Sequence, residues 1–215
     1  MRKQKIWNFY AKIYKNMFFL QKHSLRPTRQ KVLSILDEVI CNSAKEYKIL
    51  DIGCGIGQLL FEIKERFKDY KLHLTGIDPA EMMIEKANIA NSFSNIKFNL
   101  CSIENIALDS QYDVIICTHS LPYVSNMKNS FSKIYEFLAD DGVFIFGQAT
   151  CNKKYDRIVM KIVENFVSKA NYPSVNNIKN DLITAGFKLM KLEYIKTIIK
   201  IPPIFVMSCM KDKEN

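Results

Sequence analysis

The chain has 215 residues, of which 48% are apolar and 25% are charged, so it is ordinary globular material rather than a disordered tail. Its length fits one domain, or one domain with an appendage. The six cysteines form no C-x-x-C pair, which argues against a zinc ribbon, a thioredoxin-like redox site and a disulfide framework. We therefore expect free thiols, no metal site and a cytoplasmic location, because the chain shows neither a secretory signal nor an apolar stretch of membrane-spanning length.

The net charge of +9 is concentrated at the N-terminus. Residues 1–31 contain nine of the 31 basic residues and no carboxylate, which leaves 22 basic and 22 acidic residues from Val32 onward. A charge of +9 without its position would indicate a nucleic-acid binder. By position, it indicates a neutral core that carries a basic arm.

Two helices are predicted in this arm. Between residues 5 and 22 the apolar and aromatic residues recur at helical spacing on one half of the helical wheel, and most of the lysines lie on the other half. Pro27 suits the first turn of a second helix, whose apolar positions run from Val32 to Ile40. We expect residues 1–44 to form a basic amphipathic lid or arm, and residues 45–215 to form the core.

The core alternates between strand and helix patterns. Strands are expected over residues 47–52, 72–77, 96–100, 112–117 and 142–147, and helices over residues 58–67, 80–90 and 131–138. This alternation predicts a parallel sheet covered by helices on both faces. Residues 154–185 are predicted to be helical with a break at 171–173, and residues 187–195 and 204–210 to form a closing hairpin or crossover pair.

The most informative motif is Leu50-Asp51-Ile52-Gly53-Cys54-Gly55-Ile56-Gly57, which holds three of the seven glycines between a strand and a helix. Glycines let a ligand approach the backbone, and the following helix offers unpaired N–H groups. The spacing is G-x-G-x-G, with Gln58 where a dinucleotide fingerprint has its third glycine, and no Gly-Lys-Ser/Thr follows as in a Walker loop. Asp51 precedes the glycines and favours a cationic group rather than a phosphate.

Between about residue 45 and residue 150 the chain resembles the class I S-adenosylmethionine-dependent methyltransferases, motif after motif and in the same order. The resemblance implies that the glycine segment holds the methionine part of the cofactor, and that Asp78 binds both ribose hydroxyls. Leu138 to Phe146 and Ala185-Gly186-Phe187 are similar to two later motifs of that family. The residues that the resemblance places at the cofactor are Asp51, Gly53, Cys54, Gly55, Gly57, Asp78, Pro79, Met82, Ser102, Ile103, Glu104 and Cys117.

Within this set, Met82 is expected against the adenine, and Phe98 to Ile106 resembles the adenine-binding stretch. Ser102 stands where the family commonly has an acid, so it departs from the pattern and offers a weaker acceptor. The implied fold is a Rossmann-like, doubly wound, mostly parallel seven-stranded sheet with an antiparallel last strand, plus N-terminal helices. The implied reaction uses S-adenosylmethionine and yields S-adenosylhomocysteine.

His119 and Tyr123 are the candidate catalytic residues, because they follow the fourth strand at the edge where α/β proteins bind ligands. A base is needed only if the acceptor is a neutral hydroxyl or an ammonium group. A packing or capping role for His119 is the alternative. The segment Ser120-Leu121-Pro122-Tyr123 lacks the Asn of the N-P-P-Y motif of base-directed enzymes, so an O, N or C atom of a small or lipid-like molecule is favoured as the acceptor.

Three roles remain open for the basic arm. It could be a lid, with Tyr10, Tyr14 and Arg29 reaching the cofactor's carboxylate or closing the pocket. It could lie on a membrane surface and meet a lipid-like acceptor. Contact with RNA phosphates is the third role, although the chain has neither a zinc pattern nor an aromatic RNA-binding signature.

Residues 151–185 are expected to wall the acceptor pocket as a helical cap. The runner-up functions are an RNA methyltransferase that uses the arm and a non-catalytic subunit that binds the cofactor. The sequence gives no prediction of the oligomeric state.

Overall fold

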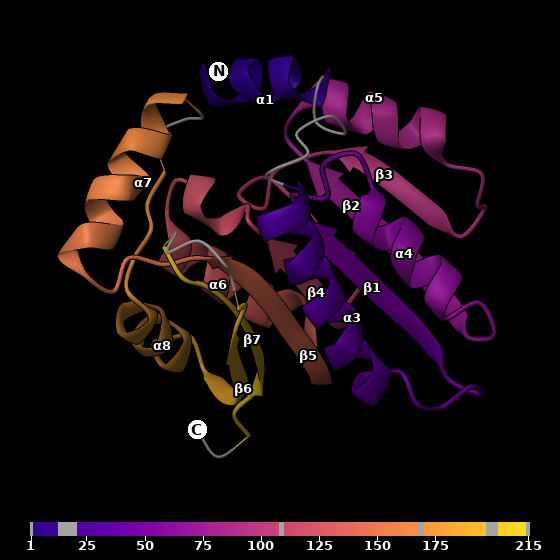
Figure 1. The fold of residues 1–215 in the computed structure, drawn as a ribbon. Coiled ribbons are helices and arrows are strands. Elements are labelled where there is room, and N and C mark those ends of the chain that lie inside the picture. The colour runs from indigo at the N-terminus through magenta and orange to yellow at the C-terminus, as the bar shows by residue number, and fades with distance from the viewer. Residues whose placement is uncertain (1, 13–20, 108–109, 167–169, 197–201, 214–215) are drawn as a thin grey trace.

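A single seven-stranded sheet organises the chain in the order β3-β2-β1-β4-β5-β7-β6 (Figure 1). The computed structural model describes residues 2–12, 21–107, 110–166, 170–196 and 202–213. Only β7 runs antiparallel to its two neighbours, so the predicted fold class is confirmed. The strands are β1 (Glu46–Ile52), β2 (Lys71–Asp78), β3 (Ile96–Leu100), β4 (Tyr112–Thr118), β5 (Leu138–Ala149), β6 (Phe187–Tyr194) and β7 (Ile204–Lys211).

Helices cover both faces of this sheet. The described elements are α1 (Arg2–Ala11), the π-helical turn η2 (Gln21–Leu25), α3 (Arg26–Val39), α4 (Gln58–Arg66), α5 (Glu81–Ala90), the 3₁₀ turn η3 (Leu121–Tyr123), α6 (Met127–Phe137), α7 (Lys154–Phe166) and α8 (Val175–Thr184). Helices α3, α4 and α5 share one apolar core with the sheet, and α6 and α8 share the other. The second core is aromatic, with the rings of Phe144 and Phe146 stacked at 4.9 Å. None of the described helices combines the length and the hydropathy that crossing a bilayer requires.

The bounds of several elements differ from those predicted. Helix α6 begins at Met127, four residues earlier than expected, because the Asn126 side chain caps it by accepting a hydrogen bond from the backbone N–H of Asn129. Leu138, expected in the helix, is the first residue of β5. Of the predicted helix over residues 5–22, the described part contains α1 to Ala11 and then η2, while residues 13–20 lie outside the described residues.

Helix α3 packs directly on the sheet. Val32 and Leu36 on it are fully buried, and so is Thr28. A Cβ atom at Gly147 of β5 would lie 2.7 Å from Thr28 Cγ2, so the glycine permits this close approach. As a result, the first turn of α3 reaches the sheet edge at which β1, β2 and β4 end, the edge where open α/β sheets place their ligands.

Candidate functional site

A loop of left-handed glycines joins β1 to α4. Gly53, Gly55 and Gly57 have φ angles of +73°, +55° and +79°. A Cβ at Gly53 would lie 2.3 Å from Ser120 Cβ, and one at Gly57 would lie 2.6 Å from the ring of Phe98. A Cβ at Gly55 would meet no heavy atom within 4 Å. Two glycines are therefore required by packing, while the middle one faces open space that a ligand can occupy.

The end of β2 holds this loop in place. The backbone N–H groups of Gly53 and Cys54 both donate to the carbonyl oxygen of Ile77, at 2.8 and 3.0 Å. The Asp78 carboxylate accepts from the N–H of Gly55 at 3.0 Å and from that of Ala80 at 2.8 Å. Burial raises the pKa of Asp78 to about 6, although these two bonds oppose the shift. Each carboxylate oxygen still has a second lone pair with which to accept a hydroxyl hydrogen.

Asp51 lies beneath the same loop and is 1% exposed. Its Oδ1 atom has no hydrogen-bond partner among the described residues. Burial raises the pKa of Asp51 to about 7, the Asp78 charge adds to the shift, and the Arg29 charge opposes it. A buried carboxylate oxygen without a partner needs a donor from solvent or from a bound molecule.

Arg29 comes from α3 and lines the same small cavity as Asp51. Its Nε donates to both carboxylate oxygens of Glu62, at 3.0 and 3.1 Å. The cavity thus places a carboxylate and a guanidinium side by side, which complements the ammonium and carboxylate groups of an amino acid.

This cavity contains five of the predicted site residues and five that sequence reasoning missed. The predicted ones are Arg29, Asp51, Gly53, Cys54 and His119. The additional ones are Leu25, Ile56, Gln58, Leu59 and Thr118. Ile56 lies within the glycine motif, Gln58 and Leu59 follow it, and Thr118 precedes His119, so their positions in the sequence were a usable signal. Leu25 comes from the N-terminal arm.

His119 has a left-handed backbone, with a φ of +58°, and its N–H donates to the carbonyl oxygen of Gly147 at 2.7 Å. Its Nε2 atom lies 2.9 Å from Thr28 Oγ1, and that hydroxyl donates its single hydrogen to the carbonyl oxygen of Ser24. Nε2 must therefore carry the hydrogen, which leaves Nδ1 as the accepting nitrogen. Burial of the imidazole ring disfavours its charged form and lowers the pKa of His119 to about 4, although part of the residue is exposed. The positive charge of Arg29 is the second cause of this shift.

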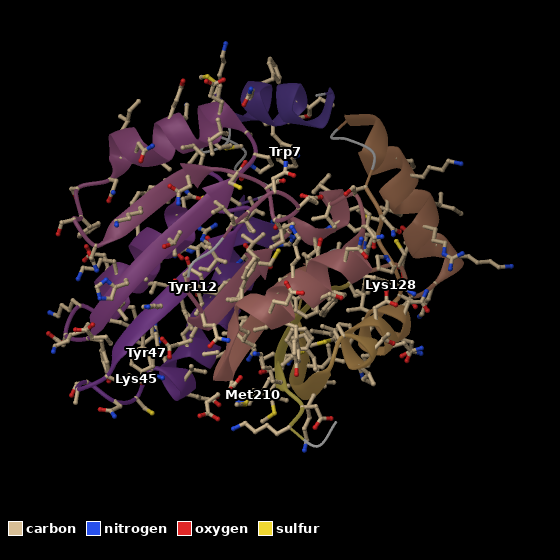
Figure 2. All side chains as sticks on the ribbon, turned by 180° about the vertical axis from the view of Figure 1, so that it is seen from behind. Trp7, Lys45, Tyr47, Tyr112, Lys128 and Met210 are labelled. Atoms are coloured by element: carbon tan, nitrogen blue, oxygen red, sulfur yellow. The ribbon has the colours of Figure 1, made fainter. Side chains whose placement is uncertain are left out.

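Tyr123 lies away from this cavity, between two other parts of the chain. Its hydroxyl is 3.1 Å from that of Tyr172, and its ring meets Trp7 of α1 edge-on at 5.2 Å. Figure 2 shows Trp7 on the side of α1 that faces the rest of the molecule. The turn after β4 thus contacts both α1 and the segment that precedes α8, where Asn171 N–H donates to the Pro122 carbonyl.

On the side where the adenine is expected, Met82 packs in a cluster with Trp7 of α1, and its N–H donates to Asn8 Oδ1 at 3.1 Å. Pro79 is exposed, Ser102 is half-buried and Ile103 belongs to the core of the opposite face.

Two further predicted residues hold other loops. Glu104 Oε1 accepts from the N–H and the hydroxyl of Ser125, so its carboxylate ties down the turn that leads into α6. Cys117 is buried below the cavity, and its thiol donates to Ser120 Oγ, which itself donates to the Ile52 carbonyl. Tyr14 lies outside the described residues.

Gln148, near the end of β5, was not predicted. It is 1% exposed, and neither polar atom of its side-chain amide has a partner among the described residues. The signal in the sequence was a polar residue after the apolar run Phe144-Ile145-Phe146. A buried amide of this kind calls for ordered water or a bound molecule as its partner.

Comparison with known proteins gives a consistent set of relatives. A family described as "Methyltransferase domain" matches residues 43–197. Malonyl-[acyl-carrier protein] O-methyltransferase of Bacillus cereus is 32% identical over 137 residues, which is 64% of this chain and 46% of that protein. Malonyl-[acyl-carrier protein] O-methyltransferase 1 of Ilyobacter polytropus is 27% identical over 218 residues, covering 95% of this chain and 77% of that protein. The chain therefore spans less than half of the Bacillus relative and about three quarters of the other.

A solved structure of a SAM-dependent methyltransferase from Thermotoga maritima shares the fold. It superposes with a TM-score of 0.73 at 18% sequence identity, and the match covers 98% of this chain and 100% of that one.

Replacing Asp51 by Asn tests the electrostatics of this cavity. A carboxyl whose pKa is raised on folding destabilises the folded chain above its unfolded pKa, so stability falls as the pH rises from about 4 to about 7. We expect Asp51→Asn to raise the free energy of unfolding at pH 8 by on the order of 1–4 kcal/mol and to change it little at pH 4. Urea denaturation at both pH values measures this, with the exposed Asp69→Asn as the control. A variant that loses stability equally at both pH values would contradict the raised pKa.

Proposed function

Because the chain belongs to the methyltransferase-domain family, we propose that it transfers the methyl group of S-adenosylmethionine to an oxygen, nitrogen or carbon atom of a small molecule. The observation that carries this proposal is the glycine loop, held left-handed between Asp51 and Asp78, with open space beside Gly55. S-adenosylhomocysteine would be the second product.

The residues of the cavity, together with Asp78 at the end of β2, fit that cofactor. Asp51 and Arg29 match the charges of its amino-acid end, and the remaining lone pairs of Asp78 match its ribose hydroxyls. When bound, S-adenosylmethionine supplies a methyl group on an activated sulfonium, so the protein's main task is to align the acceptor.

His119 is our first candidate for a general base and Tyr123 our second. The ring of His119 is neutral at pH 7 and its Nδ1 atom is the accepting nitrogen, while its lowered pKa makes it a weak base. The Tyr123 hydroxyl is hydrogen-bonded to that of Tyr172, so Tyr172 can donate to the Tyr123 oxygen. For a carboxylate acceptor no proton has to be removed, and both residues would then position the acceptor.

We favour oxygen as the methylated atom, and a carboxylate as the group that carries it. Both relatives described above are O-methyltransferases by name. The turn after β4 also lacks the Asn that base-directed enzymes use to hold an exocyclic amine.

We propose that the N-terminal arm (residues 1–44) acts as a lid on the core (residues 45–215). Asn8 and Trp7 of α1 contact Met82 and Tyr123, which lie on opposite sides of the sheet edge that carries the cavity. Trp7 and Ala11 of α1 pack in one cluster with Met82, which favours a lid over a membrane or RNA contact, while Phe9 of the same helix is exposed.

The space beside Gly55 gives the first test. Gly55→Ala adds a methyl group there, and its left-handed backbone costs about 1–2 kcal/mol of stability. We expect calorimetric titration to show S-adenosylmethionine affinity weakened by roughly tenfold or more, about 1.4 kcal/mol. Gly186→Ala is the matched control, since Gly186 is also left-handed but lies before β6. Equal affinities in both variants would place the cofactor elsewhere.

Deleting residues 1–24 separates the roles of the arm. A lid predicts weaker S-adenosylmethionine affinity with no change in liposome sedimentation or RNA retention, because α1 contacts the core at the cavity edge. Loss of liposome or RNA binding with unchanged cofactor affinity would support the competing roles.

The reaction itself is tested with S-adenosylmethionine that carries a tritiated methyl group. We expect label to pass to a malonyl thioester as a methyl ester, which alkali releases as volatile methanol, and not to total RNA or to small amines. Label in RNA would support the runner-up function. Cofactor binding without transfer to any extract fraction would support a non-catalytic subunit.

The base assignment is tested within this assay. With the cofactor saturating, the double variant His119→Asn with Tyr123→Phe should lower the single-turnover rate. An unchanged rate would show that neither residue acts as a base.

A further inference from the structure

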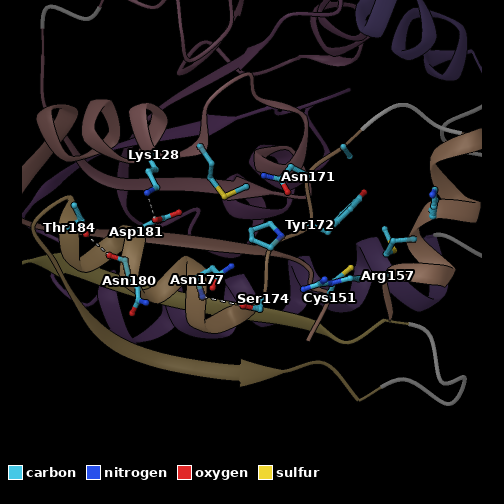
Figure 3. A pocket seen from close by; sticks show the side chains of 15 residues that line it. Lys128, Cys151, Arg157, Asn171, Tyr172, Ser174, Asn177, Asn180, Asp181 and Thr184 are labelled. Atoms are coloured by element: carbon cyan, nitrogen blue, oxygen red, sulfur yellow. Dashed lines mark hydrogen bonds and ion pairs between the residues drawn. The ribbon is translucent and has the colours of Figure 1, made fainter. Parts of the chain in front are cut away.

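A second, larger hollow lies between α7, α8 and the start of α6, away from the glycine loop (Figure 3). This groove has a volume of about 800 Å³. Its floor contains the buried residues Met127, Cys151 and Met160, and its rim is polar.

The charged residues of the groove are mostly basic. Lys128, Arg157 and Lys161 line it, and Asp181 is the one carboxylate among its described lining residues. Asp181 Oδ1 lies 3.3 Å from Lys128 Nζ, so the charges of these two residues offset each other. Arg157 and Lys161 are four residues apart on α7 and so share one face of that helix, and neither has an ion-pair partner among the described residues. Among the described lining residues, positive charge is therefore in excess.

Helix α8 adds donors on the opposite wall. Its N-cap Ser174 and its residue Asn177 both line the groove, so the positive end of a ten-residue helix lies there, although the N–H groups of Val175 and Asn177 already donate to Asn152 Oδ1 and Ser174 Oγ. Asn171 and Asn180 add side-chain amides. Two cationic side chains that face a helix N-terminus across a groove form a suitable site for an anion.

The groove is connected to the region of the glycine loop through tyrosines. Tyr172 lines the groove, and its hydroxyl is 3.1 Å from that of Tyr123. Tyr123 belongs to the turn that begins at Ser120, and Ser120 packs against Gly53. These contacts place the groove next to the turn after β4, whose first residue packs against the glycine loop.

We propose that this groove binds the anionic end of the methyl acceptor, a carboxylate or phosphate group, through Arg157 and Lys161. This inference rests on the proposed function, because it assigns the acceptor of the same reaction. The apolar floor would contact the part of the acceptor between its anionic end and its methylated atom.

The test uses isotope-labelled protein saturated with S-adenosylhomocysteine and two probes, inorganic phosphate and malonate. NMR titration should give saturable amide shifts at residues 174–177 and 127–128 with at least one probe, and the stronger probe identifies the group. The double variant Arg157→Gln with Lys161→Gln should weaken that binding by roughly tenfold or more. The control, Lys154→Gln on α7 with Lys179→Gln on α8, removes the same amount of charge at positions outside the groove lining and should keep the affinity.

Absent shifts, or an equal loss of affinity in both double variants, would overturn the groove assignment. Calorimetric titration with S-adenosylmethionine separates this outcome from failure of the proposed function. If the cofactor binds and the anions do not, the groove proposal alone fails. If the anions bind and the cofactor does not, the proposed function fails, and with it the identification of the anion as a methyl acceptor.

Discussion

The contact between the end of β2 and the glycine loop determines the geometry of the site. One carbonyl, that of Ile77, accepts from both Gly53 and Cys54, and the Asp78 carboxylate accepts from Gly55. These bonds keep the loop in a left-handed conformation that side chains would resist. That conformation determines where α4 starts and how Asp51 is buried below the loop. It also allows Ser120 to pack against Gly53.

Holding the loop in this way brings two carboxylates close together in a buried place. The pKa values of Asp51 and Asp78 both rise, and the charge of Arg29 partly offsets the rise at Asp51. Arg29 comes from the basic N-terminal arm, where it is buried and paired with Glu62. The arm is therefore part of the site as well as the carrier of the excess charge, and its location near two acidic residues has an electrostatic reason.

The sheet and the loop could be predicted from the sequence because local patterns encode them. Buried strands are apolar runs, and a glycine triplet with an acid at each of two strand ends is visible in one dimension. The start of α6 was missed because one capping side chain, Asn126, decides it. The tautomer of His119 depends on Thr28, which is 91 residues away in the chain, and no local pattern contains that contact.

The groove that Arg157 and Lys161 line could not be predicted from local sequence patterns either. Residues 151–185 could be predicted as helical and mixed in polarity, but the pairing of α7 with the start of α8 is a tertiary feature. The burial of the Gln148 amide, whose polar atoms have no partner among the described residues, also depends on packing around β5 and not on a local pattern.

A crystal structure of the complex with S-adenosylhomocysteine would show directly whether the glycine loop holds the cofactor. We expect electron density along that loop, with the amino-acid end between Asp51 and Arg29, the ribose at Asp78 and backbone contact beside Gly55. Density for the ligand elsewhere, or none at saturating concentration, would contradict this expectation.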